Sequence, residues 1–214
     1  MTEKNYCQVV GDITTDYVTS DCLIVQVNNC VARKPKVKSL TWNLKEKFHW
    51  ANPYQHRVKS MNFNNLATPS SRPELGSISI ICPPRNIFTG AKRDGPTFAC
   101  IFSQYKMGLP TSDYFNKKLL YLDEKYKKYS ASAYDSRVMR YSYFKSGLNK
   151  LMRELRFNPE YSHLSKIIFP AFIGCHSGGG DWKLYEEEIK KFSRKMRGRK
   201  RVIVVTYTAH ETTC

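Results

Sequence analysis

Six short apolar runs alternate with segments of helical periodicity along the 214-residue chain. The apolar runs have the length and composition of β-strands, and they span residues 6–10, 22–27, 77–82, 98–102, 166–172 and 202–207. The segments between them that predict helices are residues 39–48, 138–155 and 181–196. This alternation favours a three-layer α/β sandwich with a mixed or mostly parallel sheet. Ligands of such folds bind outside the carboxyl ends of the strands.

Irregular stretches interrupt the pattern at residues 52–74, 83–96 and 106–135. The first is rich in Asn, Pro and Ser and carries turn signals such as Thr68-Pro69. Loops of this length are typical of a lid, a binding element or a mobile surface tract. The length of the chain suits one good-sized core, so we predict a single domain over residues 1–214 with these insertions.

A glycine-rich junction, IIFPAFIGCHSGGGDW, joins the fifth apolar run to the last predicted helix. Glycine has no Cβ, so backbone N–H groups there can approach an anion closely, and a helix N-terminus adds positive potential. The alternative is an ordinary tight turn, which needs one or two glycines. Four of them, Gly174, Gly178, Gly179 and Gly180, favour a phosphate-binding loop.

The net charge of +17 indicates an anionic partner. Residues 190–201, KKFSRKMRGRKR, contain eight basic and no acidic residues. Cations at a helix C-terminus complement the helix dipole, and this accounts for two or three of them. Nucleic-acid attraction and an ordinary solvated surface both remain open for this segment. Tyrosines interleaved with lysines between residues 114 and 143 suit stacking on single-stranded nucleic acid or poly(ADP-ribose). The alternative is that these tyrosines pack beneath a basic surface.

Seven cysteines form an odd set without a CxxC pair, which predicts reduced thiols and no metal site. The nearest metal-like sequence, residues 210–214, carries little weight because it lacks a second histidine. No apolar run is long enough to cross a bilayer, and residues 1–16 lack the apolar region of a secretory signal. We therefore expect a soluble intracellular protein of the cytoplasm or nucleus, with no membrane partner.

Three separated segments together resemble the macrodomain family, the ADP-ribose-binding α/β/α fold. Residues 10–14, VGDIT, are similar to its GDIT-type element, and CLIVQVNNC is similar to the strand that leads to its first loop. FPAFIGCHSGGGDW is the most specific piece and resembles the second loop of the ADP-ribose-1″-phosphate phosphatase and terminal ADP-ribose glycohydrolase branch. The resemblance covers most of the chain except the insertions. It implies a three-layer α/β/α macrodomain with a central mixed sheet.

The resemblance also implies a set of ligand-binding residues, namely Asp12, Ile13, Asn29, Gly174, Cys175, Ser177, Gly178, Gly179, Gly180 and Tyr207. Asp12 would accept a hydrogen bond from the adenine amino group, or else it starts an Asx-turn. The glycine-rich segment would hold the diphosphate, with N–H donors from Cys175 to Gly179. Tyr207 would lie against the adenine, or else it caps the core at a strand end.

The catalytic residues implied by the resemblance are Asn28, His176 and Asp181. Asn28, like Asn29, would hydrogen-bond the distal ribose, and His176 or Asp181 would position or activate water. Asp181 also stands where a helix N-cap is expected, and His176 can equally be an exposed surface residue.

The first loop, residues 31–38, lacks the family's glycines. Cations would have to replace backbone donors there, and the candidates are Arg33, Lys34, Lys36 and Lys38. The catalytic lysine of the glycohydrolases has two candidates in this sequence, Lys92 and Lys106.

The expected function is binding of ADP-ribose, without a cofactor, and hydrolysis of a bond at the distal ribose. The substrate would be a 1″-phosphate or an ADP-ribosylated protein. A non-catalytic reader of ADP-ribose or poly(ADP-ribose) is the alternative. A third possibility is a nucleic-acid-binding protein that reuses the fold through residues Lys190 to Arg201.

Overall fold

The structure is a computed structural model that describes residues 5–61, 65–85, 94–110 and 134–207. Its centre is a six-stranded sheet. In spatial order the strands are β1 (Tyr6–Val10), β6 (Arg201–Thr206), β5 (Lys166–Pro170), β2 (Cys22–Asn29), β4 (Thr97–Gln104) and β3 (Ile78–Ile81). All neighbouring pairs are parallel except β3 and β4. The predicted mixed sheet is therefore confirmed.

The three predicted helices are present as α1 (Leu40–Lys47), α4 (Arg137–Phe157) and α5 (Trp182–Met196). Each begins directly after a capping side chain, Ser39, Ser136 or Asp181, whose oxygen accepts a hydrogen bond from a backbone N–H in the first turn. Two short 3-10 helices, η1 (Pro69–Ser71) and η3 (Pro159–Tyr161), complete the described elements.

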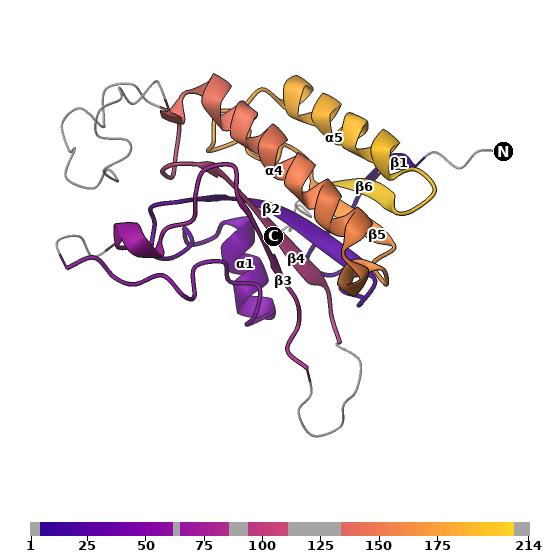
Figure 1. Ribbon diagram of the computed structural model, residues 1–214, viewed down its shortest axis with the longest axis horizontal. Coiled ribbons are helices and arrows are strands. Elements are labelled where there is room, and N and C mark those ends of the chain that lie inside the picture. The colour runs from indigo at the N-terminus through magenta and orange to yellow at the C-terminus, as the bar shows by residue number, and fades with distance from the viewer. Residues whose placement is uncertain (1–4, 62–64, 86–93, 111–133, 208–214) are drawn as a thin grey trace, which may run out of the picture.

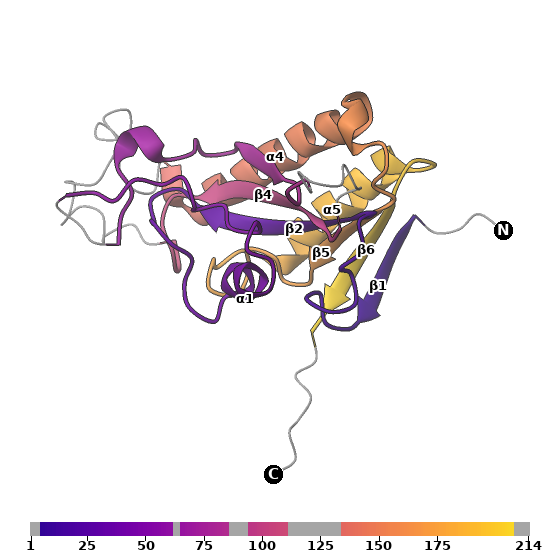
Figure 2. The same ribbon diagram turned by 90° about the horizontal axis from the view of Figure 1, so that it is seen from below.

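The helices form two layers on the sheet. In Figure 1, α4 and α5 lie side by side on one face, and Figure 2 shows α1 on the opposite face. Alternate residues of β2 serve the two cores, with Leu23 and Val25 packed under α4 and α5 and with Cys22 and Ile24 on the α1 side. Because both faces are covered, the central strands are almost continuously apolar, as parallel strands require.

Three strands end two residues away from the predicted position. β2 and β4 run on to Asn29 and Gln104, because polar side chains at their carboxyl ends are enclosed by the structure around them. β5 stops at Pro170, two residues before the predicted end, since Phe172 adopts a positive φ of 57° that extended chain cannot continue through.

An isolated bridge between Ala32 and Leu66 ties the first insertion to the loop after β2, and a second bridge, Lys59 with Ala67, lies within the insertion. The other two insertions lie largely outside the described residues. None of the described helices has the length and apolar character needed to cross a membrane. No disulfide bond joins the six cysteines that the structure describes.

Candidate ligand-binding cleft

A cavity of about 380 Å³ opens at the carboxyl ends of β2, β4 and β5. It lies between the start of α1 and the segment 171–180, which we call the glycine loop. A second cavity of about 90 Å³ adjoins it. The two share five lining residues, Val27, Ser39, Thr41, Gln104 and Ser177. They therefore form one cleft at the position where open α/β sheets bind ligands.

Three consecutive amides of the glycine loop are available to a ligand. The loop folds on itself through hydrogen bonds from Cys175 N to Phe172 O (2.9 Å), from Gly179 N to Cys175 O (3.0 Å) and from Gly180 N to Gly174 O (3.1 Å). The N–H groups of His176, Ser177 and Gly178 have no hydrogen-bond partner among the described residues. All three residues line the larger cavity. Adjacent free N–H groups of this kind make a concave site for an anion.

The glycines of this loop are also required by close packing. A Cβ on Gly174 or on Gly180 would lie 2.9 Å from the ring of Tyr185, and a Cβ on Gly178 would collide with the backbone carbonyl oxygen of Gly174. Gly174 in addition has a φ of 72°, which disfavours other residues. The glycines therefore serve both purposes that the sequence left open: they allow a tight turn, and they form a loop whose amides are available to a ligand.

A buried ion pair holds the glycine loop in place. Arg140 of α4 donates to both carboxylate oxygens of Asp135, at 2.8 and 2.7 Å, and both side chains are at least 98% buried. Its Nη1 atom also donates to the carbonyl oxygens of Gly108 (2.6 Å) and Gly178 (3.0 Å). Arg140 thus fixes two loops that line the cleft. Bidentate geometry together with satisfied donors is the condition under which a buried pair is tolerated.

The first loop is held by Arg57 in place of the glycines that the family resemblance leads one to expect. The Arg57 guanidinium donates to the carbonyl oxygens of Asn29 (2.8 Å), Cys30 (2.9 Å) and Ala32 (2.5 Å). It lies 4.1 Å from the centre of the Tyr54 ring, and burial lowers its pKa. None of the described carboxylates lies within 4.0 Å of it. Its positive charge is therefore balanced by carbonyl dipoles and an aromatic face.

Two buried amide oxygens of β2 lack a hydrogen-bond partner in the described structure, Gln26 Oε1 and Asn28 Oδ1. Both residues line the cleft and are at most 3% exposed. Asn28 is oriented by its Nδ2 donation to Thr41 Oγ1 (3.0 Å). An unsatisfied buried acceptor costs about 1–3 kcal/mol. A ligand that brings hydroxyl donors would remove this cost.

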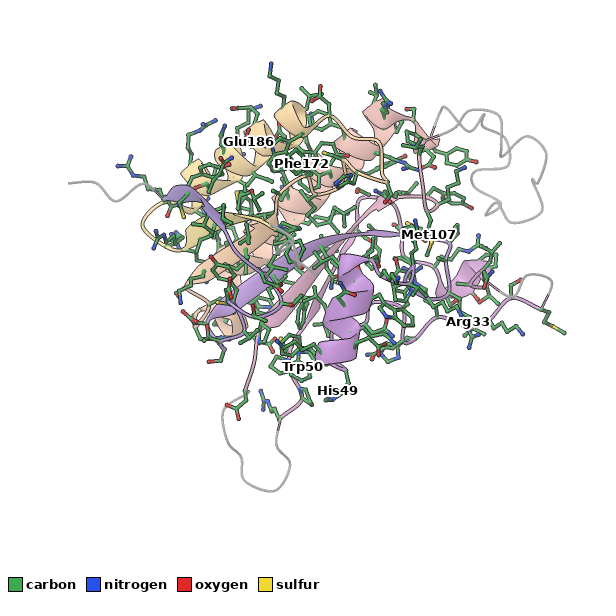
Figure 3. All side chains as sticks on the ribbon, turned by 180° about the vertical axis from the view of Figure 1, so that it is seen from behind. Arg33, His49, Trp50, Met107, Phe172 and Glu186 are labelled. Carbon is green, nitrogen blue, oxygen red and sulfur yellow. The ribbon has the colours of Figure 1, made fainter. Side chains whose placement is uncertain are left out.

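Backbone strain is concentrated at the same cleft. Lys38, with a φ of 61°, and Phe172 are the two non-glycine residues with positive φ in the described chain, and both line the larger cavity. Such a conformation costs roughly 1–2 kcal/mol per residue. In Figure 3, Phe172 and Met107 lie toward the start of α1, and His49 and Trp50 lie beyond its end. Strain of this kind clusters at functional sites.

The structure brings together part of the predicted site. The predicted residues that line the cleft are Asn28, Asn29, Lys36, Lys38, Gly174, Cys175, His176, Ser177 and Gly178. Asn29 is committed to the fold, because its Oδ1 accepts from Ala32 N and its Nδ2 donates to Tyr54 Oη.

The remaining predicted residues lie outside the lining of the two cavities. Asp181 caps α5 by accepting from Lys183 N (3.0 Å), and Asp12 closes an Asx-turn by accepting from Thr14 N (2.8 Å). Ile13 is 6% exposed and belongs to the core on the α1 side. Tyr207 is 67% exposed, so it does not cap the core. The ligand roles of these residues stay predictions.

Gly179, Gly180, Arg33 and Lys34 are not among the lining residues either. Burial lowers the pKa of Lys106, one of the two lysine candidates, and Lys92 lies outside the described residues.

Several residues of the cleft escaped the sequence analysis. Gln26 carried a usable signal, because a glutamine inside an apolar strand two positions before Asn28 shares a face with it. Gln104 likewise ends an apolar run. Arg140, Asp135 and Arg57 carried none, since the loops that they hold are contacted through backbone atoms far away in the sequence.

Comparison with solved structures identifies the fold. The macrodomain of Mycobacterium tuberculosis DarG superimposes with a TM-score of 0.55 at 15% identity, covering 95% of this chain and 97% of that one. A mutant macrodomain of Oceanobacillus iheyensis with ADPR gives a TM-score of 0.46 at 13% identity, covering 95% and 84%. No protein-family model matches the sequence, and no curated protein matches it. The likeness to the DarG macrodomain shows that the chain has the α/β/α macrodomain fold.

Proposed function

We propose that the cleft binds ADP-ribose or a derivative of it, with the diphosphate on the amides of His176, Ser177 and Gly178. These three unpaired N–H groups are the observation that carries the proposal. Support comes from the cavity volume of about 380 Å³, which is in the range of small-molecule sites, and from the macrodomain fold.

The groups around the amides suit the other parts of such a ligand. Lys36 and Lys38 and the N-terminus of α1 contribute positive potential near the diphosphate. The unpaired oxygens of Gln26 and Asn28 suit the hydroxyls of a distal ribose. The adenine end would extend toward Asp12, whose Oδ2 has no hydrogen bond to a described residue, and toward the exposed Tyr207.

Hydrolysis at the distal ribose is the finer part of the proposal, and His176 is its candidate base. The substrate would be ADP-ribose-1″-phosphate or an ADP-ribosylated protein. His176 is exposed and is the one histidine among the described lining residues. Asp181 remains the second candidate, because a cap bond occupies only its Oδ1 atom.

A reader without catalytic activity is the second candidate function. One observation favours it: the described residues that line the two cavities include no Asp or Glu. A hydrolase would then rely on His176 or on a carboxylate outside the lining. Turnover assays with ADP-ribose-1″-phosphate and with an ADP-ribosylated protein separate the two candidates. Release of phosphate or of ADP-ribose supports the enzyme, and binding without turnover supports the reader.

Calorimetry with ADP-ribose tests the binding proposal. Ser177→Glu places a negative charge beside the free amides and should weaken binding at least tenfold, which is about 1.4 kcal/mol. Ser162→Glu, the same change at an exposed residue after η3, is the matched control and should leave affinity unchanged. Equal affinity of both variants would remove the glycine loop from the site.

A further inference from the structure

Half of the basic residues in the segment 190–201 are already neutralised or buried. Lys190, Lys191 and Arg194 form ion pairs with Glu186 (3.0 Å), Glu188 (2.8 Å) and Glu187 (3.1 Å) on the same helix. Lys200 is 6% exposed, and its Nζ donates to the carbonyl oxygens of Tyr161 (2.7 Å) and Leu164 (2.6 Å). These four residues therefore have structural roles.

The other four form what we call the cationic turn, Lys195, Arg197, Arg199 and Arg201. All are exposed. Their side chains make no ion pair or hydrogen bond with any residue that the structure describes. Arg199 contributes to the lowered pKa of Lys200, although burial is the larger cause. The turn is thus a local concentration of positive charge that the fold itself does not use.

The cationic turn and the cleft lie at opposite ends of α5. The helix has 15 residues, so it is about 22 Å long. Figure 1 shows α5 starting on the side of the glycine loop and its yellow end leading into β6 on the other side. Over that distance, at physiological salt, exposed charges are largely screened from each other. The turn therefore does not serve the ligand cleft.

Acidic groups near the turn do not cancel it. Asp21 is engaged with Lys166 (3.2 Å). Glu154 lies on α4 and Glu160 on η3. Two arginines of α4, Arg153 and Arg156, are exposed in the same region. The hydrogen bonds of Lys200 to the segment before β5 hold these elements against the turn. The side of the molecule around the turn keeps an excess of positive charge.

We propose that the cationic turn is a docking surface for the phosphate backbone of a nucleic acid. Three of its four cations are arginines, whose planar guanidinium groups match phosphate oxygens with two parallel hydrogen bonds. The four cations lie at the end of α5, on the turn that follows it and on the first residue of β6. This arrangement suits contacts to successive phosphates without base readout. Binding is then independent of sequence and strongly dependent on salt. The proposal is independent of the proposed function of the cleft.

Two variants with equal net charge test this surface. Arg197, Arg199 and Arg201 are changed to Gln in one variant, and Lys190, Lys191 and Arg194 in the other. Fluorescence anisotropy measures binding of a labelled oligothymidylate of about 20 nucleotides across a salt series. Four phosphate contacts predict a slope of log K against log salt near −3, because each contact on a single strand contributes about −0.7. The first variant should reduce the slope to about −1, and the second should keep it near −3.

The outcomes distinguish a local surface from a diffuse charge effect. Equal losses in both variants would overturn the proposal, as would absence of binding at low salt. Binding to phosphatidylserine vesicles without binding to the oligonucleotide would overturn it in favour of a membrane surface. Saturating ADP-ribose should leave the oligonucleotide affinity unchanged, and competition would place the nucleic acid in the cleft and overturn the proposal.

Discussion

Individual polar side chains in and around the cleft fall into two groups. Arg57 and Arg140 donate to backbone carbonyls and so fix three segments that border the cleft, namely the first loop, the segment around Gly108 and the glycine loop. Gln26 and Asn28 keep a buried acceptor unpaired. The first group gives the cleft a fixed shape, and the second leaves hydrogen-bonding capacity for a ligand. This separation of supporting from ligand-facing groups is what a preformed binding site requires.

Removing Arg140 should destabilise the chain strongly. Arg140→Met leaves Asp135 as an uncompensated buried charge, which costs about 3–5 kcal/mol. Arg153→Met, at an exposed position of the same helix, is the matched control and should stay within about 0.5 kcal/mol. Urea denaturation measures both. A loss below about 1 kcal/mol for Arg140→Met would show that the pair does not hold the loops.

Asp181 can be tested for capping and catalysis separately. Asp181→Ala removes the cap oxygen and should cost about 1 kcal/mol of stability, while Asp181→Ser keeps a capping oxygen and should cost less. If the carboxylate is catalytic, both variants lose turnover of ADP-ribose-1″-phosphate. If it is only a cap, Asp181→Ser retains both stability and rate. Thermal unfolding and phosphate release are the two measurements.

At the scale of elements, the strands, helices and glycine loop follow from local pattern. The three helices appear where periodicity and capping residues predict them, and the six strands appear where apolar runs do. The parallel order and the mixed sheet follow from the alternation of these elements. The local signal ends where contacts are distant in sequence. Arg140 donates a hydrogen bond to the carbonyl oxygen of Gly178, 38 positions along the chain. Arg57 donates to carbonyl oxygens of the first loop, more than 20 positions before it. Neither contact could be predicted from the sequence.

A hydrogen-bonded carboxylate joins the starts of β2 and β5 and should make stability depend on pH. Asp21 accepts hydrogen bonds from Ser165 and Thr19, and these bonds and Lys166 lower its pKa. Between the lowered folded value and the ordinary value near 3.9, the unfolded chain binds more protons, so stability falls as pH falls.

Asp21→Asn should reduce stability at pH 7 and flatten its decline below about pH 4. Glu46→Gln, at an exposed ion pair with Lys45, serves as the control and should leave the wild-type slope in place. Urea unfolding at a series of pH values measures both variants. An unchanged slope in Asp21→Asn would contradict the role of this carboxylate.

At the scale of the whole molecule, the two ends of the sheet have different chemistry. The carboxyl ends of the strands carry the cleft, with its free amides, strained backbone and unpaired oxygens. The opposite end carries the cationic turn, at the far end of α5. The net charge of +17 favours association with anionic partners. Under the two proposals, the chain would hold a small nucleotide ligand at one end while it is docked on a polyanion at the other.

Binding of ADP-ribose on the glycine loop is tested most directly by an amide chemical-shift titration with this ligand. We expect saturable shifts of the His176, Ser177 and Gly178 resonances, with the Arg197 and Arg199 resonances unmoved. If saturating ADP-ribose leaves the glycine-loop amides at their free positions, the cleft does not bind this ligand and the proposed function is wrong.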